Sequence, residues 1–341
     1  MIEPDTDTSR PSSSNSTTDS RGVIPPCHTL GTVHHKTTRD IVRHVTRELR
    51  LLSRRGLLRL GTSAVIGVPM ASLIAACSDS DRTDESGGDD GGLPAEAILA
   101  ARWIPTELGP GHQRLPLSIG DASGLTQDGP ERLDAKIVSL EDDSVVVERI
   151  SAERRSLGEG TIPFWTFHSF LERPGFYGLV VEGGPDEGAA FQIQDVADLS
   201  VDRVGDTLTA FDTPTFDDSR GVEVVCTRQP EPCPFHDVTL TEALSSGRPV
   251  VYLVGTPAHC QTGVCGPVLE QMIELATDLG DTAVFVHADV YADRAATEVA
   301  PAVRAARLTF EPTVFVTDAS GVVIDRLDAV WDAGELRELL S

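Results

Sequence analysis

Basic residues are scarce in this 341-residue chain, in which 28 Lys and Arg face 53 Asp and Glu and give a formal net charge of −25. The imbalance lies in the body of the chain. Residues 1–76 carry ten basic and six acidic side chains, whereas residues 77–341 carry 18 and 47. So acidic a body repels the phosphates that a nucleic-acid-binding protein must neutralise. We therefore exclude DNA and RNA as partners.

Aromatic residues and several familiar motifs are also lacking. Aromatic side chains make up only 5% of the chain, too few for a platform that stacks bases or sugars. Beyond the N-terminal segment, no apolar run is long enough to cross a bilayer. The sequence contains no Gly-rich phosphate loop, no Gly-x-Ser-x-Gly turn and no His-Glu-x-x-His motif. Cysteine is absent from residues 78–225, which excludes a disulfide within that region.

Residues 1–76 have the order of a secretory leader. Arg54 and Arg55 precede the uncharged run Leu60–Ala76, whose last residues, Ile-Ala-Ala, are followed by Cys77. The arginine pair resembles a twin-arginine (Tat) signal. Ile-Ala-Ala-Cys resembles the lipobox of bacterial lipoproteins, which implies that Cys77 is lipidated and becomes the mature N-terminus. The resemblance places the protein at the cell membrane, lipid-anchored on the extracytoplasmic face.

The segment before the arginine pair is longer than usual for such a leader. We expect the true start of translation downstream, for instance near Val45, with residues 1–45 not part of the translated protein. Residues 77–93, from the lipidated cysteine onward, are mostly acidic, Ser and Gly. Such a composition cannot bury enough apolar surface to order itself, so we predict a flexible spacer between the anchor and the folded part.

Residues 94–198 consist of short apolar runs separated by Gly, Pro and Asp. Short strands at near-regular spacing predict an antiparallel β-sandwich. The Pro-Gly turns and the late Pro-Gly-Phe-Tyr strand resemble Ig-like modules of exported bacterial proteins, which implies a spacer or docking module. Residues 199–222 are polar and rich in Thr, Asp and Pro, and we interpret them as a linker.

After residue 222 the pattern changes. The apolar run Pro249–Val254 predicts a strand buried on both faces. Further periodicity predicts helices and strands in alternation, so that residues 223–341 should form an α/β sheet covered by helices. The expected elements are helices over 266–279 and 295–306 and from Ala333, and strands over 283–290, 313–317 and 322–324.

Two cysteines, Cys260 and Cys265, lie between the first of these strands and the long helix. Unpaired N–H groups at a helix N-terminus favour a thiolate, and can lower a cysteine pKa into the range of about 3.5–7.5. Residues five positions apart in one helix would point about 140° apart. Cys260 must therefore lie in the loop and Cys265 in the first turn, a placement that suits a reactive thiol pair.

From the end of the first strand onward, the chain contains Thr256-Pro257, Cys260, Cys265, Gly266-Pro267 and Glu311-Pro312-Thr313. This order of elements and residues resembles the thioredoxin-like fold, and in particular exported thioredoxin-like lipoproteins of high-GC bacteria. The resemblance implies that Cys260 attacks a disulfide, that Cys265 resolves the mixed disulfide, and that Pro312 belongs to a cis-proline loop facing the pair. It implies no cofactor, and as partners extracytoplasmic proteins with thiols or disulfides. Two features differ from thioredoxin: four residues separate the cysteines instead of two, and His259 replaces a tryptophan. His259 either stabilises the Cys260 thiolate or points away.

Other interpretations of this pair remain open. An inert Cys260–Cys265 disulfide would make the chain a non-catalytic binding or scaffold lipoprotein. One branch of the peroxiredoxins uses the same spacing, although Leu253 stands where its proline belongs. A copper carrier would add His287 or His236 to the two thiolates; otherwise His287 is a buried core residue. The sequence thus favours a membrane-tethered thiol–disulfide oxidoreductase, while its being an enzyme stays open.

A second pair, Cys226 and Cys233, lies in a proline-rich loop. We expect a structural disulfide between these two, and no metal site in the chain. The connectivity does not follow from sequence alone. The alternative is a zinc site made of Cys226, Cys233, His236 and one of the two cysteines of the first pair, with a spacing unlike that of common zinc fingers.

Overall fold

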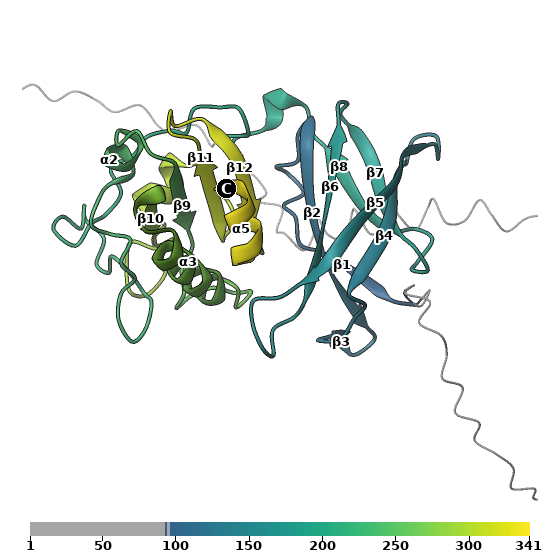
Figure 1. The fold of residues 1–341 in the computed structure, drawn as a ribbon, viewed down its shortest axis with the longest axis horizontal. Coiled ribbons are helices and arrows are strands. Elements are labelled where there is room, and N and C mark those ends of the chain that lie inside the picture. Colours follow the sequence, from purple (N-terminus) through teal and green to yellow (C-terminus); the bar gives the residue numbers. More distant parts are fainter. Residues whose placement is uncertain (1–92, 94–95) are drawn as a thin grey trace, which may run out of the picture. The chain divides into compact units, whose positions relative to one another are not determined.

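The computed structural model describes Leu93 and residues 96–341 (Figure 1). The predicted twin-arginine signal at Arg54 and Arg55, the lipidated Cys77 and almost all of the spacer lie outside the described residues. The described residues belong to one compact unit, Thr83–Ser341. Within them, no helix combines the length and apolar character that a membrane crossing requires.

An eight-stranded antiparallel sheet forms the first half of the described chain. Its strands follow the order β1-β2-β6-β5-β4-β7-β8, and β3 pairs with β2. The end strands β1 and β8 lie against each other, so the sheet nearly closes into a barrel. The strands are β1 (Ile98–Ala101), β2 (Gly111–Asp121), β3 (Gly124–Leu125), β4 (Arg132–Ser139), β5 (Val145–Arg155), β6 (Phe164–Leu171), β7 (Gly175–Val181) and β8 (Ala189–Ile193).

Every second side chain along these strands points inward and fills the interior of the nearly closed sheet. Along β2, Leu115, Leu117 and Ile119 point into the core, where they meet Trp165 and Phe167 of the paired strand β6. The short 3₁₀ helix η2 (Val196–Asp198) follows β8.

A smaller, four-stranded sheet has the order β10-β9-β11-β12. Strand β10 runs parallel to β9, whereas β11 is antiparallel to both β9 and β12. The strands are β9 (Val250–Val254), β10 (Val284–Ala288), β11 (Thr313–Thr317) and β12 (Val323–Asp328). The helices are α2 (Leu240–Leu244), α3 (Cys265–Leu279), η3 (Gly280–Thr282), α4 (Pro301–Ala305) and α5 (Ala333–Leu339).

Helices pack on both faces of this sheet. Val251 and Leu253 of β9 contact the cluster that includes Met272 of α3 and Leu336 of α5. Tyr252 points the other way, into the cluster formed with α2 and α4. All five residues of β9 are buried, as its continuous apolar run predicted. Strand β9 is therefore packed on both faces, and its last residue leads directly into the loop that carries Cys260.

The predicted fold class, an all-β Ig-like sandwich followed by an α/β thioredoxin-like domain, is wrong. The described residues are mostly β: one nearly closed antiparallel sheet and a second small sheet, with little helix. The expected helix over 295–306 shrinks to Pro301–Ala305, because Pro301 opens the helix at its first position and Ala296 before it has a left-handed φ of 54°. This is not an α/β thioredoxin fold.

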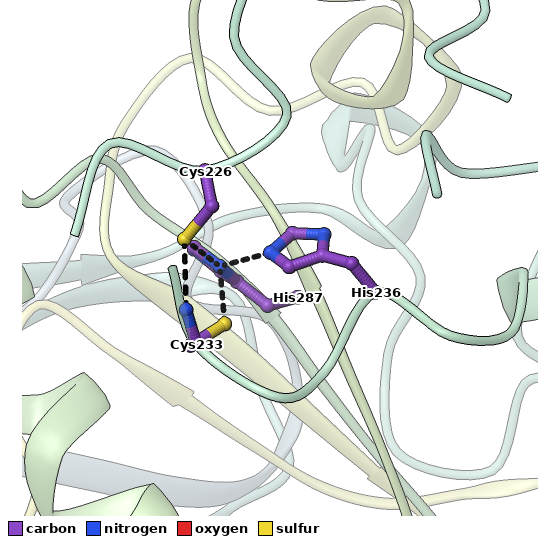
Figure 2. Close-up of side chains that lie close together, drawn as sticks. All are labelled: Cys226, Cys233, His236 and His287. Atoms are coloured by element: carbon purple, nitrogen blue, oxygen red, sulfur yellow. Dashed lines mark hydrogen bonds between the residues drawn. The ribbon is translucent and has the colours of Figure 1, made fainter. Parts of the chain in front are cut away.

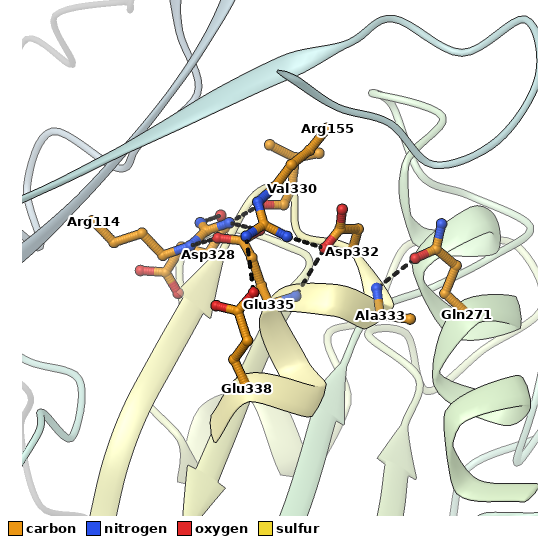
Figure 3. Close-up of polar contacts among 9 residues, drawn as sticks. All are labelled: Arg114, Arg155, Gln271, Asp328, Val330, Asp332, Ala333, Glu335 and Glu338. Carbon is orange, nitrogen blue, oxygen red and sulfur yellow. Dashed lines mark hydrogen bonds and ion pairs between the residues drawn. The ribbon is translucent and has the colours of Figure 1, made fainter. Parts of the chain in front are cut away.

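Polar contacts join β2 of the large sheet to β12 and α5 (Figure 3). Arg114 donates to both carboxylate oxygens of Glu335, at 3.0 and 2.8 Å, and to the carbonyl oxygens of Asp328 and Val330, at 3.2 and 2.5 Å. Both charged side chains are buried, at 8% and 5% exposure. Arg155 adds a mostly buried pair with Asp332 at 2.9 Å. The large sheet and helix α5 thus share a buried ionic contact.

Candidate functional site

The loop between β9 and α3 brings Cys260 and Cys265 together. Cys265 is the first residue of α3, and its backbone N–H donates to the sulfur of Cys260 at 3.3 Å. The hydroxyl of Thr262 lies 3.3 Å from the same sulfur. Gly263, with a φ of 69°, provides the left-handed turn that this close approach requires. Both cysteines are free thiols in this structure.

The environments of the two sulfurs differ. Cys260 is partly exposed, whereas Cys265 is buried. Hydrogen bonds from Cys265 and Thr262 outweigh desolvation and lower the pKa of Cys260 to about 4. The pKa of Cys265 is raised, because its proton is held in the hydrogen bond to Cys260 and because its sulfur is buried next to Glu311. At neutral pH, Cys260 is therefore the thiolate and Cys265 the thiol.

Glu311 is the third member of this site. Its Oε2 accepts the backbone N–H of Thr256 at 2.7 Å and lies 3.5 Å from the sulfur of Cys265. Burial, together with the negative charge on Cys260, raises the pKa of Glu311 to about 7 despite the hydrogen bond from Thr256. A carboxyl with such a pKa exchanges protons near neutral pH. In the sequence, Glu311 stands out only as part of the Glu-Pro-Thr motif, and no signal there pointed to a role for its carboxyl group.

Pro312 and His259 flank the pair. The Glu311–Pro312 peptide bond is cis, and Gly255 lies close to both Pro312 and Cys265: a Cβ atom at Gly255 would be 3.3 Å from Pro312 and 3.7 Å from Cys265. The ring of His259 packs edge-on against Tyr291, with ring centres 5.8 Å apart. Its predicted role beside the Cys260 thiolate stays a prediction.

A second group gathers Cys226, Cys233, His236 and His287 (Figure 2). The first three come from the loop that precedes α2, and His287 from β10. All four are buried. Both cysteines are free thiols in this structure and lie near the Nδ1 atom of His287. The predicted Cys226–Cys233 disulfide stays a prediction.

The two groups are distinct sets of side chains. Cys260 and Cys265 combine with Glu311, and the two histidines combine with the other cysteine pair. The zinc alternative of the sequence analysis named Cys226, Cys233 and His236 but took its fourth ligand from the first pair, and the structure places His287 in that position. The spacing gave no signal for this, because His287 comes close only when β10 pairs with β9. Comparison with protein-family models and with curated proteins found no match.

Proposed function

We propose that the protein is a thiol–disulfide oxidoreductase that works through Cys260 and Cys265. The observation that carries the proposal is the asymmetry of the pair: a partly exposed Cys260 with its pKa lowered to about 4 beside a buried, protonated Cys265. A thiolate is the attacking species in disulfide exchange, and it must be accessible. An inert structural pair requires neither property.

The reaction follows from the positions of the three groups. The thiolate of Cys260 attacks one sulfur of a substrate disulfide, forms a mixed disulfide and expels the other sulfur as a thiolate, which takes a proton from water. Glu311 then accepts the proton of Cys265, and the new thiolate attacks the sulfur of Cys260. The second substrate sulfur leaves as a thiolate and takes the proton from Glu311, which returns to its carboxylate form. The substrate disulfide has gained two electrons and two protons, and the protein holds a Cys260–Cys265 disulfide. The reverse sequence oxidises a substrate dithiol.

The membrane tether belongs to the same proposal. Lipidation of Cys77, after export directed by Arg54 and Arg55, would hold the redox pair outside the cytoplasm, where disulfide-bonded proteins occur. Its partners would then be extracytoplasmic proteins with thiols or disulfides. Labelling with a radioactive fatty acid should mark the wild-type protein and not the Cys77→Ala variant; equal labelling of both would refute the tether.

A trapping experiment tests the chemistry. In Cys265→Ser the mixed disulfide cannot be resolved, so a disulfide-bonded model protein such as insulin should stay covalently attached to Cys260. Cys260→Ser is the matched control, which should form no adduct and reduce insulin at the uncatalysed rate. Adducts of equal yield in both variants would show that another cysteine reacts, and no adduct in either would favour the scaffold interpretation.

A further inference from the structure

We infer that Cys226, Cys233, His236 and His287 form a tetrahedral zinc site. The four ligand atoms, two sulfurs and two imidazole nitrogens, all lie within 4.8 Å of one another. Figure 2 shows the side chains turned toward one another from the loop and from β10. Two cysteines and two histidines are a common ligand set of structural zinc.

The distances have the scale of a metal site. With Zn–S bonds of about 2.3 Å and Zn–N bonds of about 2.0–2.1 Å, the ligand atoms of a tetrahedron lie roughly 3.3–3.8 Å apart. From Nδ1 of His287, the sulfurs of Cys233 and Cys226 lie at 3.3 and 3.9 Å, and Nε2 of His236 lies at 3.1 Å. Shifts of a few tenths of an ångström, which side-chain rotations supply, would bring these three distances to the tetrahedral values, and the remaining ligand atoms lie within 4.8 Å of one another.

The hydrogen bond at Nε2 of His287 leaves its Nδ1 atom facing the other three side chains of the site. Its Nε2 lies 2.9 Å from the carbonyl oxygen of Gly255. A carbonyl oxygen only accepts, so Nε2 carries a proton, and in the neutral ring, the form that binds a metal, Nδ1 is bare. Metal-binding histidines typically donate their second nitrogen in this way, which fixes the ring and its tautomer.

In the neutral ring, and without a cation, three polar groups compete for the lone pair of Nδ1. Two thiols and Nε2 of His236 converge on Nδ1 of His287, and one lone pair satisfies only one donor. Buried polar groups that lack partners are costly. A zinc ion at the centre would bind all four atoms. Two thiolates cancel its two positive charges, so the buried site would be neutral, and the two thiol protons would leave to solvent on binding.

A backbone contact supports the thiolate of Cys226. The N–H of Cys233 donates to the sulfur of Cys226 at 3.3 Å, a contact that holds a sulfur in position for a metal. With four protein ligands and no open position, the site would be structural and not catalytic. The inference therefore does not depend on the proposed redox function.

The site would fasten the reactive loop to the sheet. Thr227, next to Cys226, binds both carboxylate oxygens of Asp289, at 2.7 and 2.9 Å, just after β10. Its hydroxyl accepts the N–H of Ala258 at 3.3 Å, two residues before Cys260. Zinc at His287 would thus clip the 226–236 segment onto β10 and hold one side of the loop that carries Cys260.

The test measures metal content and coordination in the full-length chain. Protein reduced with a non-chelating phosphine, incubated with zinc and freed of excess should retain one zinc ion per chain by atomic emission. X-ray absorption should show two sulfur and two nitrogen neighbours. Cys226→Ser/Cys233→Ser should lose the ion, whereas the matched control Cys260→Ser/Cys265→Ser should keep it. Zinc retained equally by both double variants would overturn the site.

A second measurement covers the case in which the first double variant fails to fold. In wild-type protein, bound zinc should protect Cys226 and Cys233 from alkylation, and a chelator should remove that protection. Cleavage after Arg228 separates these two cysteines, so a disulfide between them would appear as linked peptides. Such linked peptides in zinc-treated, reduced protein, or reaction at the same rate with and without chelator, would overturn the proposal. Preference for copper(I) in direct competition would overturn the assignment to zinc.

Discussion

At the scale of single residues, the acid–base behaviour of the redox site depends on Glu311. The hydrogen bonds that Cys260 receives lower its pKa, and the same contacts leave Cys265 protonated. The buried thiol can attack only after losing its proton, and Oε2 of Glu311 is 3.5 Å from its sulfur. Because the pKa of Glu311 is raised to about 7, it can accept a proton above that pH and not below it.

Glu311→Gln should therefore slow resolution selectively. Reaction with an aromatic disulfide releases one coloured thiolate on attack by Cys260 and a second on resolution by Cys265, and stopped-flow absorbance separates the two. In the wild type the second step should accelerate as the pH rises through about 7, whereas the first stays flat because the pKa of Cys260 is about 4. The variant should keep the first step and lose the inflection of the second. An unchanged inflection would exclude Glu311 as the proton acceptor.

At the scale of elements, Arg114 of β2 joins the large sheet to α5. Burial alone would raise the pKa of Glu335, but the charge and hydrogen bonds of Arg114 outweigh it and lower that pKa. The pair therefore stabilises the fold above the ordinary carboxylate pKa of about 4.3, and its contribution is lost as the pH falls through the lowered folded value.

Arg114→Met should destabilise the protein by about 3–5 kcal/mol, because a buried carboxylate and two carbonyl oxygens lose their donor. Arg337→Met, on the helix that carries Glu335, is the control. The partner of Arg337, Asp278, is 2.7 Å away, but both side chains are at least half exposed, so the loss of stability should be below about 1 kcal/mol. Urea unfolding at pH 7 and pH 3 measures both. Equal losses, or an Arg114→Met effect that does not shrink at pH 3, would contradict this account.

Local sequence predicted some elements well and others poorly. The apolar run before Gly255 predicted β9, and the amphipathic pattern predicted α3 to within a residue. The alanine-rich stretch over 295–306 also suggested a helix, but alanine propensity is weak against a proline at 301 and a left-handed residue at 296. The predicted helix content was therefore too high, and the predicted α/β fold class was wrong.

At the scale of the whole molecule, the features that the sequence did not predict are contacts between distant segments. Whether the strands between 98 and 193 form two sheets or one nearly closed sheet depends on β1 meeting β8, which no local pattern encodes. Likewise, Cys260 and Cys265 meet because they are neighbours in sequence, whereas His287 reaches Cys226 and Cys233 only through the pairing of β9 with β10.

The reduction potential of the Cys260–Cys265 pair tests the central proposal most directly. It is measured on the full-length protein by equilibration in thiol redox buffers, alkylation and peptide mass spectrometry, which reports this pair separately from Cys226 and Cys233. We predict a value between about −270 and −120 mV, the range of proteins that exchange disulfides. A value below about −300 mV would mark a structural disulfide and would contradict the oxidoreductase assignment.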